Sequence, residues 1–107
     1  MEKRQSLRKE LRIKAQLTID GKGSMTVRTM DIGKFGMCLV GMALPLTPGE
    51  QVHVAFEMAF NGVIHPLAVN ARISHCVNTT DDGFRAGLQF VDLDESAVAL
   101  LAQYIGA

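Results

Sequence analysis

The sequence predicts a fold dominated by β-strands: a six-stranded antiparallel barrel followed by one short C-terminal α-helix. Two observations predict the strands. Six stretches of the 107-residue chain alternate apolar and polar residues, and glycine-rich or Asn-Gly turns separate most of these stretches. A third observation supports the helix, since the apolar period changes after Asp92. Hairpin spacing with a final helix is typical of a small barrel whose open end is covered.

The strands are expected in chain order, with a turn signal between most neighbours. Asp20-Gly21-Lys22-Gly23 and Asn61-Gly62 have strong hairpin chemistry, and two prolines with a glycine mark a loop over residues 44–49. The six expected strands lie within residues 12–19, 25–31, 36–41, 52–58, 67–74 and 84–90.

The helix is expected to begin close to residue 94. Asp92 and Glu95 have the spacing of a capping box, and Asp94 is an alternative cap. Apolar residues then repeat at helical spacing, at Val98, Leu101, Ala102 and Ile105. This pattern predicts an amphipathic helix that covers an apolar surface.

Composition excludes several classes of protein. No apolar run approaches the ~20 residues needed to span a bilayer, and the N-terminus lacks the apolar centre of a signal peptide, so we expect a cytoplasmic protein without membrane insertion. Cys38 and Cys76 have no metal-like spacing and are expected as free thiols, with a disulfide as the alternative. No arrangement of nucleophile and base indicates an enzyme, and no metal or cofactor is expected.

Charge is distributed unevenly along a chain whose net charge is zero. Residues 1–14 carry six basic and two acidic side chains, and the rest of the chain is acidic. We therefore divide the protein into a flexible basic arm, residues 1–11, and one domain, residues 12–107. A basic arm of this kind either binds an anionic partner or is simply a solvated N-terminal segment. Nucleic acid is not favoured, because the body is acidic and aromatic stacking platforms are few.

Two motifs carry candidate ligand-binding residues. Arg4 and Arg8 are four residues apart in the basic arm, and guanidinium groups bind phosphate through a bidentate fork or stack on flat rings. Asp31, Gly33 and Gly36 form an Asp-x-Gly-x-x-Gly turn between two expected strands. The Asp31 carboxylate accepts two parallel hydrogen bonds from a planar donor edge. Alone, each motif also fits a solvated arm or an ordinary turn.

Together with the segment Gly87–Asp92 before the helix, these motifs resemble the PilZ domain family, bacterial receptors for cyclic di-GMP. That family is marked by Arg-x-x-x-Arg and by (Asp/Asn)-x-Ser-x-x-Gly, and the resemblance runs from about Lys3 to Ile105. It implies that Arg4 and Arg8 stack on guanine and grip phosphate, with Arg12 as a possible auxiliary cation. It also implies that Asp31 reads the guanine Watson–Crick edge.

The resemblance further implies that Gly36 allows a close turn, and it locates one departure, because Gly33 stands where the family has serine. Loss of a hydrogen bond and added loop freedom cost about 1–2.5 kcal/mol, or roughly 5- to 70-fold in affinity. We expect a cyclic di-GMP receptor that relays the signal to a partner protein through ordering of its arm, in motility or biofilm control. The alternative is a degenerate adaptor that acts by protein contacts in pilus or motility control without binding the nucleotide.

Overall fold

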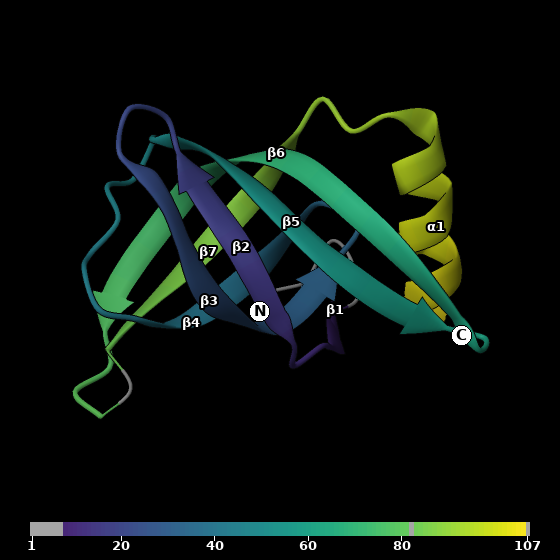
Figure 1. Cartoon of the computed structure of the whole chain (residues 1–107), viewed down its shortest axis with the longest axis horizontal. Helices are drawn as coiled ribbons and strands as arrows, with labels where there is room; N and C mark the ends of the chain where they lie inside the picture. Colours follow the sequence, from purple (N-terminus) through teal and green to yellow (C-terminus); the bar gives the residue numbers. More distant parts are fainter. Residues whose placement is uncertain (1–7, 82, 107) are drawn as a thin grey trace, which may run out of the picture.

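The computed structural model describes residues 8–81 and 83–106, which form an antiparallel sheet and one helix (Figure 1). The strands are β1 (Arg8–Glu10), β2 (Lys14–Ile19), β3 (Gly23–Gly33), β4 (Gly36–Met42), β5 (Gln51–Phe60), β6 (Val63–Asn78) and β7 (Phe84–Val91), and the helix is α1 (Glu95–Gly106). Pairing runs in the order β3-β2-β5-β6-β7-β4, and β4 pairs again with β3. These six strands therefore form a closed ring, as the sequence predicts.

The hairpin turns have the backbone geometry that their sequences predict. Asn61 and Gly62 both have positive φ, at 54° and 75°, as a type I′ turn requires. Gly21 in the turn between β2 and β3, and Gly23 at the start of β3, also have positive φ. The observed register of the β2–β3 and β5–β6 hairpins follows from these turns, since turn type and loop length determine which residues pair.

Part of the predicted arm is a strand. Residues 8–10 form β1, which pairs with β3 from Arg8 opposite Gly33 to Glu10 opposite Asp31. β2 pairs with β3 only as far as Arg28, so the second half of β3 offers β1 a free edge. The hydroxyl of Thr29, which is 1% exposed, holds the crossing between β1 and β2 by accepting from the Ile13 amide at 3.0 Å and donating to the Leu11 carbonyl.

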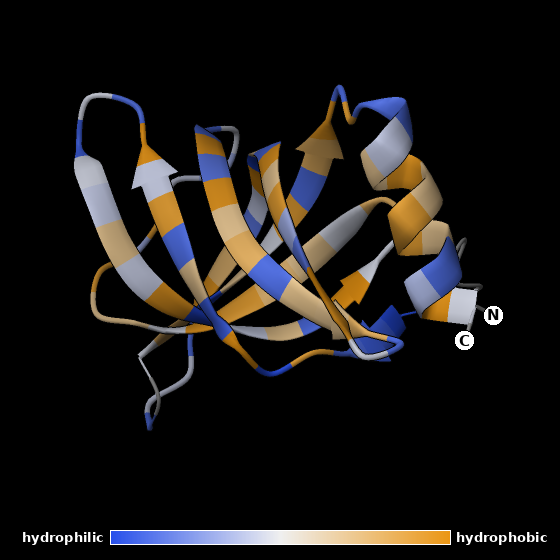
Figure 2. Cartoon of the chain, turned by 45° about the vertical axis from the view of Figure 1, so that its right-hand side comes forward, coloured by the Kyte–Doolittle hydropathy of each residue, from blue (hydrophilic) through white to orange (hydrophobic). Residues whose placement is uncertain are grey.

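Inward-facing side chains of all six ring strands fill the barrel. Figure 2 shows the alternation of apolar and polar residues along the strands, which puts the apolar set inside. The largest fully buried apolar side chains are Leu17, Ile32, Met37, Leu39, Met42, Val54, Met58, Ile73 and Leu101. Both cysteines are half-buried free thiols, and within the described residues no helix is long and apolar enough to cross a membrane.

Helix α1 begins at the second of the two predicted caps. The Ala97 amide donates to Asp94 Oδ1 at 2.8 Å, and Asp92 lies outside the helix with a φ of 53°. Asp94 therefore acts as the N-cap residue.

The buried side of α1 covers one end of the barrel through Tyr104. The Tyr104 ring packs edge-on against Phe60 at 5.9 Å, and its hydroxyl donates to the Glu10 carbonyl at 3.2 Å. The Lys9 ammonium lies 4.4 Å from the centre of the same ring. The helix thus links β1 to the tip of the β5–β6 hairpin.

Candidate functional site

The turn that carries Asp31, Gly33 and Gly36 is the β3–β4 hairpin. Lys34 and Phe35 form its loop, and the Phe90 amide on β7 donates to the Phe35 carbonyl at 2.8 Å, which ties the loop to the last strand. The ladder between β3 and β4 shifts register between Thr29 and Asp31. A bulge of this kind re-aims the following side chain, and it leaves Asp31 on the outer face of the barrel, half-buried.

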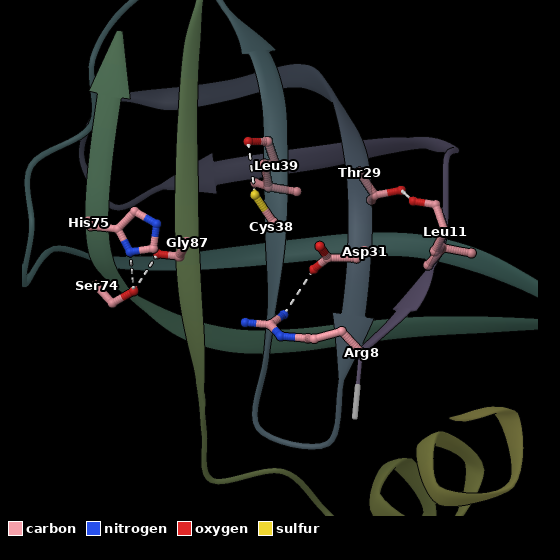
Figure 3. Close-up of polar contacts among 9 residues, drawn as sticks. All are labelled: Arg8, Leu11, Thr29, Asp31, Cys38, Leu39, Ser74, His75 and Gly87. Atoms are coloured by element: carbon pink, nitrogen blue, oxygen red, sulfur yellow. Dashed lines mark hydrogen bonds and ion pairs between the residues drawn. The ribbon is translucent and has the colours of Figure 1, made fainter. Parts of the chain in front are cut away.

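Strand β1 brings Arg8 to Asp31. The Arg8 Nη1–H donates to Asp31 Oδ1 at 3.1 Å, and the two side chains point toward each other from neighbouring strands (Figure 3). Their side chains are 31% and 32% exposed, so the ion pair is worth roughly 0–1 kcal/mol. Within residues 8–81 and 83–106, Asp31 Oδ2 has no hydrogen-bond partner. The pair therefore brings together a cation and a carboxylate that retain hydrogen-bonding capacity.

Gly36 is required by a close approach of two strands. It pairs with Gln89 on β7, and a Cβ built on Gly36 would lie 2.0 Å from the Leu88 carbonyl oxygen. A contact of that length with backbone is sterically impossible without moving a strand. Gly36 thus lets β4 lie tightly on β7 beside the loop, and its role in the structure is this approach rather than an unusual φ.

A row of paired residues extends from Asp31 across the outer face. Asp31 pairs with Cys38 on β4, Cys38 with Gly87 on β7, and Gly87 with His75 on β6, so their outward directions coincide (Figure 3). The His75 ring lies over Gly87, where an added Cβ would come within 2.2 Å of Cε1. Ser74 donates to the Gly87 carbonyl at 3.0 Å. The His75 imidazole therefore lies close over the backbone at Gly87 and forms one end of the row.

Charges converge on Cys38 in the middle of this row. Burial raises the pKa of the Cys38 thiol, and the Asp31 carboxylate raises it further, while Arg85 and Arg8 act in the opposite direction. Arg85 extends outward from β7, and its buried Nε has no hydrogen-bond partner among the described residues. The outer face thus gathers two guanidinium groups and one carboxylate around a protonated thiol.

Two hollows lie beside Phe35 of the β3–β4 loop, and Arg8 lines one of them. A shallow one of about 260 Å³ is lined by Arg8, Phe35, Gly36, Ser74, Leu88 and Gln89. A neighbouring apolar one of about 360 Å³ is lined by Lys34, Phe35, Gln89, Phe90, Leu93, Val98 and Ala102. Phe35 is common to both and is 61% exposed. A flat aromatic ring is thus available for stacking next to the cation.

The remaining predicted site residues have different positions. Gly33 is buried and pairs with Arg8, and Arg12 forms an ion pair with Glu10 on the exposed surface. Arg4 lies outside the described residues. No cluster of metal-ligating side chains occurs in the part of the chain that the structure describes.

Sequence reasoning did not include Cys38, Ser74, His75, Phe35 or Gln89 in the site. The available signal was period two, because outward positions of β4 and β7 alternate with core residues. Which outward positions meet Asp31 depends on the β3–β4 and β6–β7 register shifts, which the pattern alone does not specify.

Comparison with known proteins connects this arrangement with one family. The model of the PilZ domain matches residues 2–107, nearly the whole chain. The chain belongs to the PilZ domain family. Comparison with proteins of curated function yields no match.

Solved PilZ structures share the fold at low sequence identity. Bacillus subtilis MotI/DgrA, an inhibitor of motility, superposes with a TM-score of 0.84 at 15% identity over 98% of this chain and 50% of its own. Escherichia coli YcgR in complex with c-di-GMP gives 0.75 at 14% over 98% and 45%, and the PilZ domain of CeSA from a cellulose-synthesizing bacterium gives 0.67 at 19% over 94% and 96%. This PilZ domain spans about half the length of MotI and YcgR.

Proposed function

We propose that this PilZ domain is a receptor for cyclic di-GMP. The observation that carries the proposal is the Arg8–Asp31 pair on the outer face, beside Gly36 and a hollow lined by Arg8. Family membership and the complex of Escherichia coli YcgR with c-di-GMP support the choice of ligand.

The two side chains have complementary tasks in this proposal. The Asp31 carboxylate accepts from the N1–H and N2–H groups of a guanine, a planar donor edge that matches its two oxygens. The Arg8 guanidinium forks onto a phosphate or stacks on the base. Because the ion pair between them is about one-third exposed and weak, exchanging it for ligand contacts costs little.

Gly33 lowers the affinity that the site would otherwise have. A serine hydroxyl would add one hydrogen bond and would stiffen the free loop, and together these effects account for about 1–2.5 kcal/mol. Gly33 pairs with Arg8 through the backbone, which needs no side chain, so the strand that positions Arg8 is retained without the serine. We therefore propose a weakened site.

Signal relay is the second part of the proposal. Arg4 precedes β1, so a ligand held by Arg8 and Arg4 together would order the N-terminal arm and change the surface offered to a downstream protein. Such a receptor of a second messenger works in the cytoplasm, in motility or biofilm control.

Gly33 also favours the alternative of a PilZ adaptor that contacts its partner without nucleotide.

Isothermal titration of the purified protein with cyclic di-GMP tests the proposal. We expect binding by the wild type and loss of at least about tenfold in affinity in Arg8→Ala and Asp31→Ala, since each removes a charge-assisted contact. Arg28→Ala, an exposed arginine on the same strand as Asp31, is the matched control and should bind normally. Absence of heat at high micromolar ligand, with folded protein, would favour the adaptor.

A further inference from the structure

Strand β5 is fully paired along only half of its length. It pairs with β6 from Gln51 to Phe60, but its ladder with β2 ends where Ala55 lies opposite Gln16. Beyond that point β2 and β5 diverge, as Figure 1 shows for the half of β5 that runs toward the C-terminal helix. Among the described residues, the stretch from Phe56 to Phe60 therefore pairs with a strand on one side only.

The hairpin turn tells which backbone groups face the open side. In a two-residue type I′ hairpin the flanking residues Phe60 and Val63 exchange both hydrogen bonds, and the direction then alternates along the strand. The N–H and C=O groups of Glu57 and Ala59 consequently face away from β6. No hydrogen bond within residues 8–81 and 83–106 uses them.

Strand β2, which faces β5 across the opening, also has backbone groups that point into it. Gln16 and Thr18 pair with β5 at Ala55 and His53, so the alternation directs the backbone groups of Lys14 toward β5 as well. Lys14 would be the next partner of Glu57 if the ladder continued, and it is not paired with it. Both walls of the opening therefore present to the same space backbone donors and acceptors that form no hydrogen bond within the described part of the chain.

The space between these walls is a hollow of about 890 Å³. Its lining comes from both walls and from the strands beside them, as Ile13, Lys14, Ala15, Gln16, Thr26, Ala55, Phe56, Glu57, Pro66, Leu67 and Ala68. The other incompletely paired edge of the same hairpin, on β6 before Asn70, carries Pro66, which has no N–H to offer. Of the two edges of the β5–β6 hairpin, only the β5 edge has no proline.

We propose that this groove binds an extended segment of a partner protein, which adds a strand between β2 and β5. A strand with two free edges satisfies both walls, antiparallel to one and parallel to the other, because β2 and β5 themselves run antiparallel. The β5 strand of a second copy fits less well, because one of its edges already pairs with β6 and cannot pair with a wall of the groove.

Charge specifies the segment further. Lys14 and Arg28 are paired across β2 and β3, both are exposed, and no carboxylate of the described residues forms an ion pair with either. Because Glu57 on the β5 wall is acidic, the segment that fits places its acidic side chain outward on the β2 side, beside these cations, and small apolar side chains inward over Phe56. The groove is lined from β2 and the residue before it, from β5 and β6, and from one residue of β3, Thr26, and it shares no lining residue with the hollow beside Arg8, so the two surfaces are distinct.

Hydrogen exchange and a synthetic strand test this inference on the full chain. In the free protein the Glu57 and Ala59 amides should exchange much faster than those of Met58 and Phe60, whose N–H groups face β6. The probe is an N-acetylated peptide, Thr-Val-Glu-Val-Thr-Val-Thr, titrated while amide resonances are recorded. We expect shifts and slower exchange at Lys14, Glu57 and Ala59.

Three controls separate strand addition from other binding. Ala59→Pro removes one outward N–H without touching the β6 ladder and should weaken the probe roughly 2- to 12-fold, whereas Ala59→Ser keeps that N–H and should not. A probe N-methylated at its valines loses the donors toward one wall and should bind more weakly. Replacing its glutamate by lysine should also weaken it, through repulsion by Lys14 and Arg28.

Several results would overturn the inference. Equal protection of the Glu57, Met58, Ala59 and Phe60 amides in the free protein would mean that the edge is closed. No shifts at Glu57 and Ala59 up to the solubility limit of the probe, or equal binding by Ala59→Pro and Ala59→Ser, would exclude strand addition. Dimerisation in sedimentation that Ala59→Pro abolishes would assign the edge to a second copy instead.

Discussion

Replacing Gly36 by alanine should destabilise the barrel strongly. The added Cβ would lie 2.0 Å from the Leu88 carbonyl oxygen, and backbone cannot rotate away as a side chain can. Relieving the contact requires β4 and β7 to part by about 1 Å in a close-packed core. Overpacking costs about 1–3 kcal/mol, and a weakened ladder bond adds about 0.5–1.5 kcal/mol. We expect a loss of about 2–4 kcal/mol.

Two other glycines provide a graded comparison. At Gly87 the added Cβ meets the His75 ring, an exposed side chain that can swing aside, so Gly87→Ala should cost less than Gly36→Ala. At Gly106 nothing lies within 4 Å, and Gly106→Ala should change stability by at most about 0.5 kcal/mol.

Thermal unfolding followed by circular dichroism measures this series. For a domain of this size, about 2–4 kcal/mol corresponds to a fall in Tm of roughly 10–30 °C. Urea unfolding gives the free energies independently. If Gly36→Ala unfolded at the same temperature as Gly106→Ala, the argument from strand approach would be wrong, because a methyl group at residue 106 meets nothing within 4 Å.

Three further predictions concern the site and the helix. Gly33→Ser should bind cyclic di-GMP roughly 5- to 70-fold more tightly by titration, and unchanged affinity would refute the account of the missing hydroxyl. Asp31→Asn should speed alkylation of Cys38 in a Cys76→Ser background at pH 8, because the carboxylate raises the pKa of this thiol; an unchanged rate would leave burial as its sole cause. The hydrogen bond from the Ala97 amide is the main cause that lowers the pKa of Asp94 in the folded protein. The ionised carboxylate therefore stabilises the fold fully above the unfolded pKa of about 4. This stabilisation is lost as the pH falls through the lower pKa of the folded state. Asp94→Asn retains a capping oxygen, so its Tm should fall less than that of the wild type below pH 4, and parallel curves would contradict this assignment.

Much of the fold could be predicted because it depends on local signals. Period-two alternation identified the six ring strands, and the Asn61-Gly62 dipeptide required a type I′ turn that the backbone angles confirm. The helix start was predicted with two possible caps, and the hydrogen bond from the Ala97 amide to the Asp94 carboxylate identifies Asp94 as the cap.

Residues 8–10 show where local signals fail. Their sequence is charged and has no clean period, so it indicates an arm, yet they form β1 because β3 extends beyond the end of β2 and leaves an edge to pair. Edge pairing depends on a strand that comes later in the chain, and no local pattern encodes it.

The sequence by itself determined the barrel class and the identity of the Arg-x-x-x-Arg and Asp-x-Gly-x-x-Gly motifs, since alternation and spacing are properties of neighbouring residues. Tertiary structure alone decided that Arg8 contacts Asp31, that Cys38, Gly87 and His75 share the same row, and that β2 and β5 part beyond Ala55. The reason is that bulges and strand divergence depend on how the whole ring closes, and a shift of one residue moves a side chain to the other face.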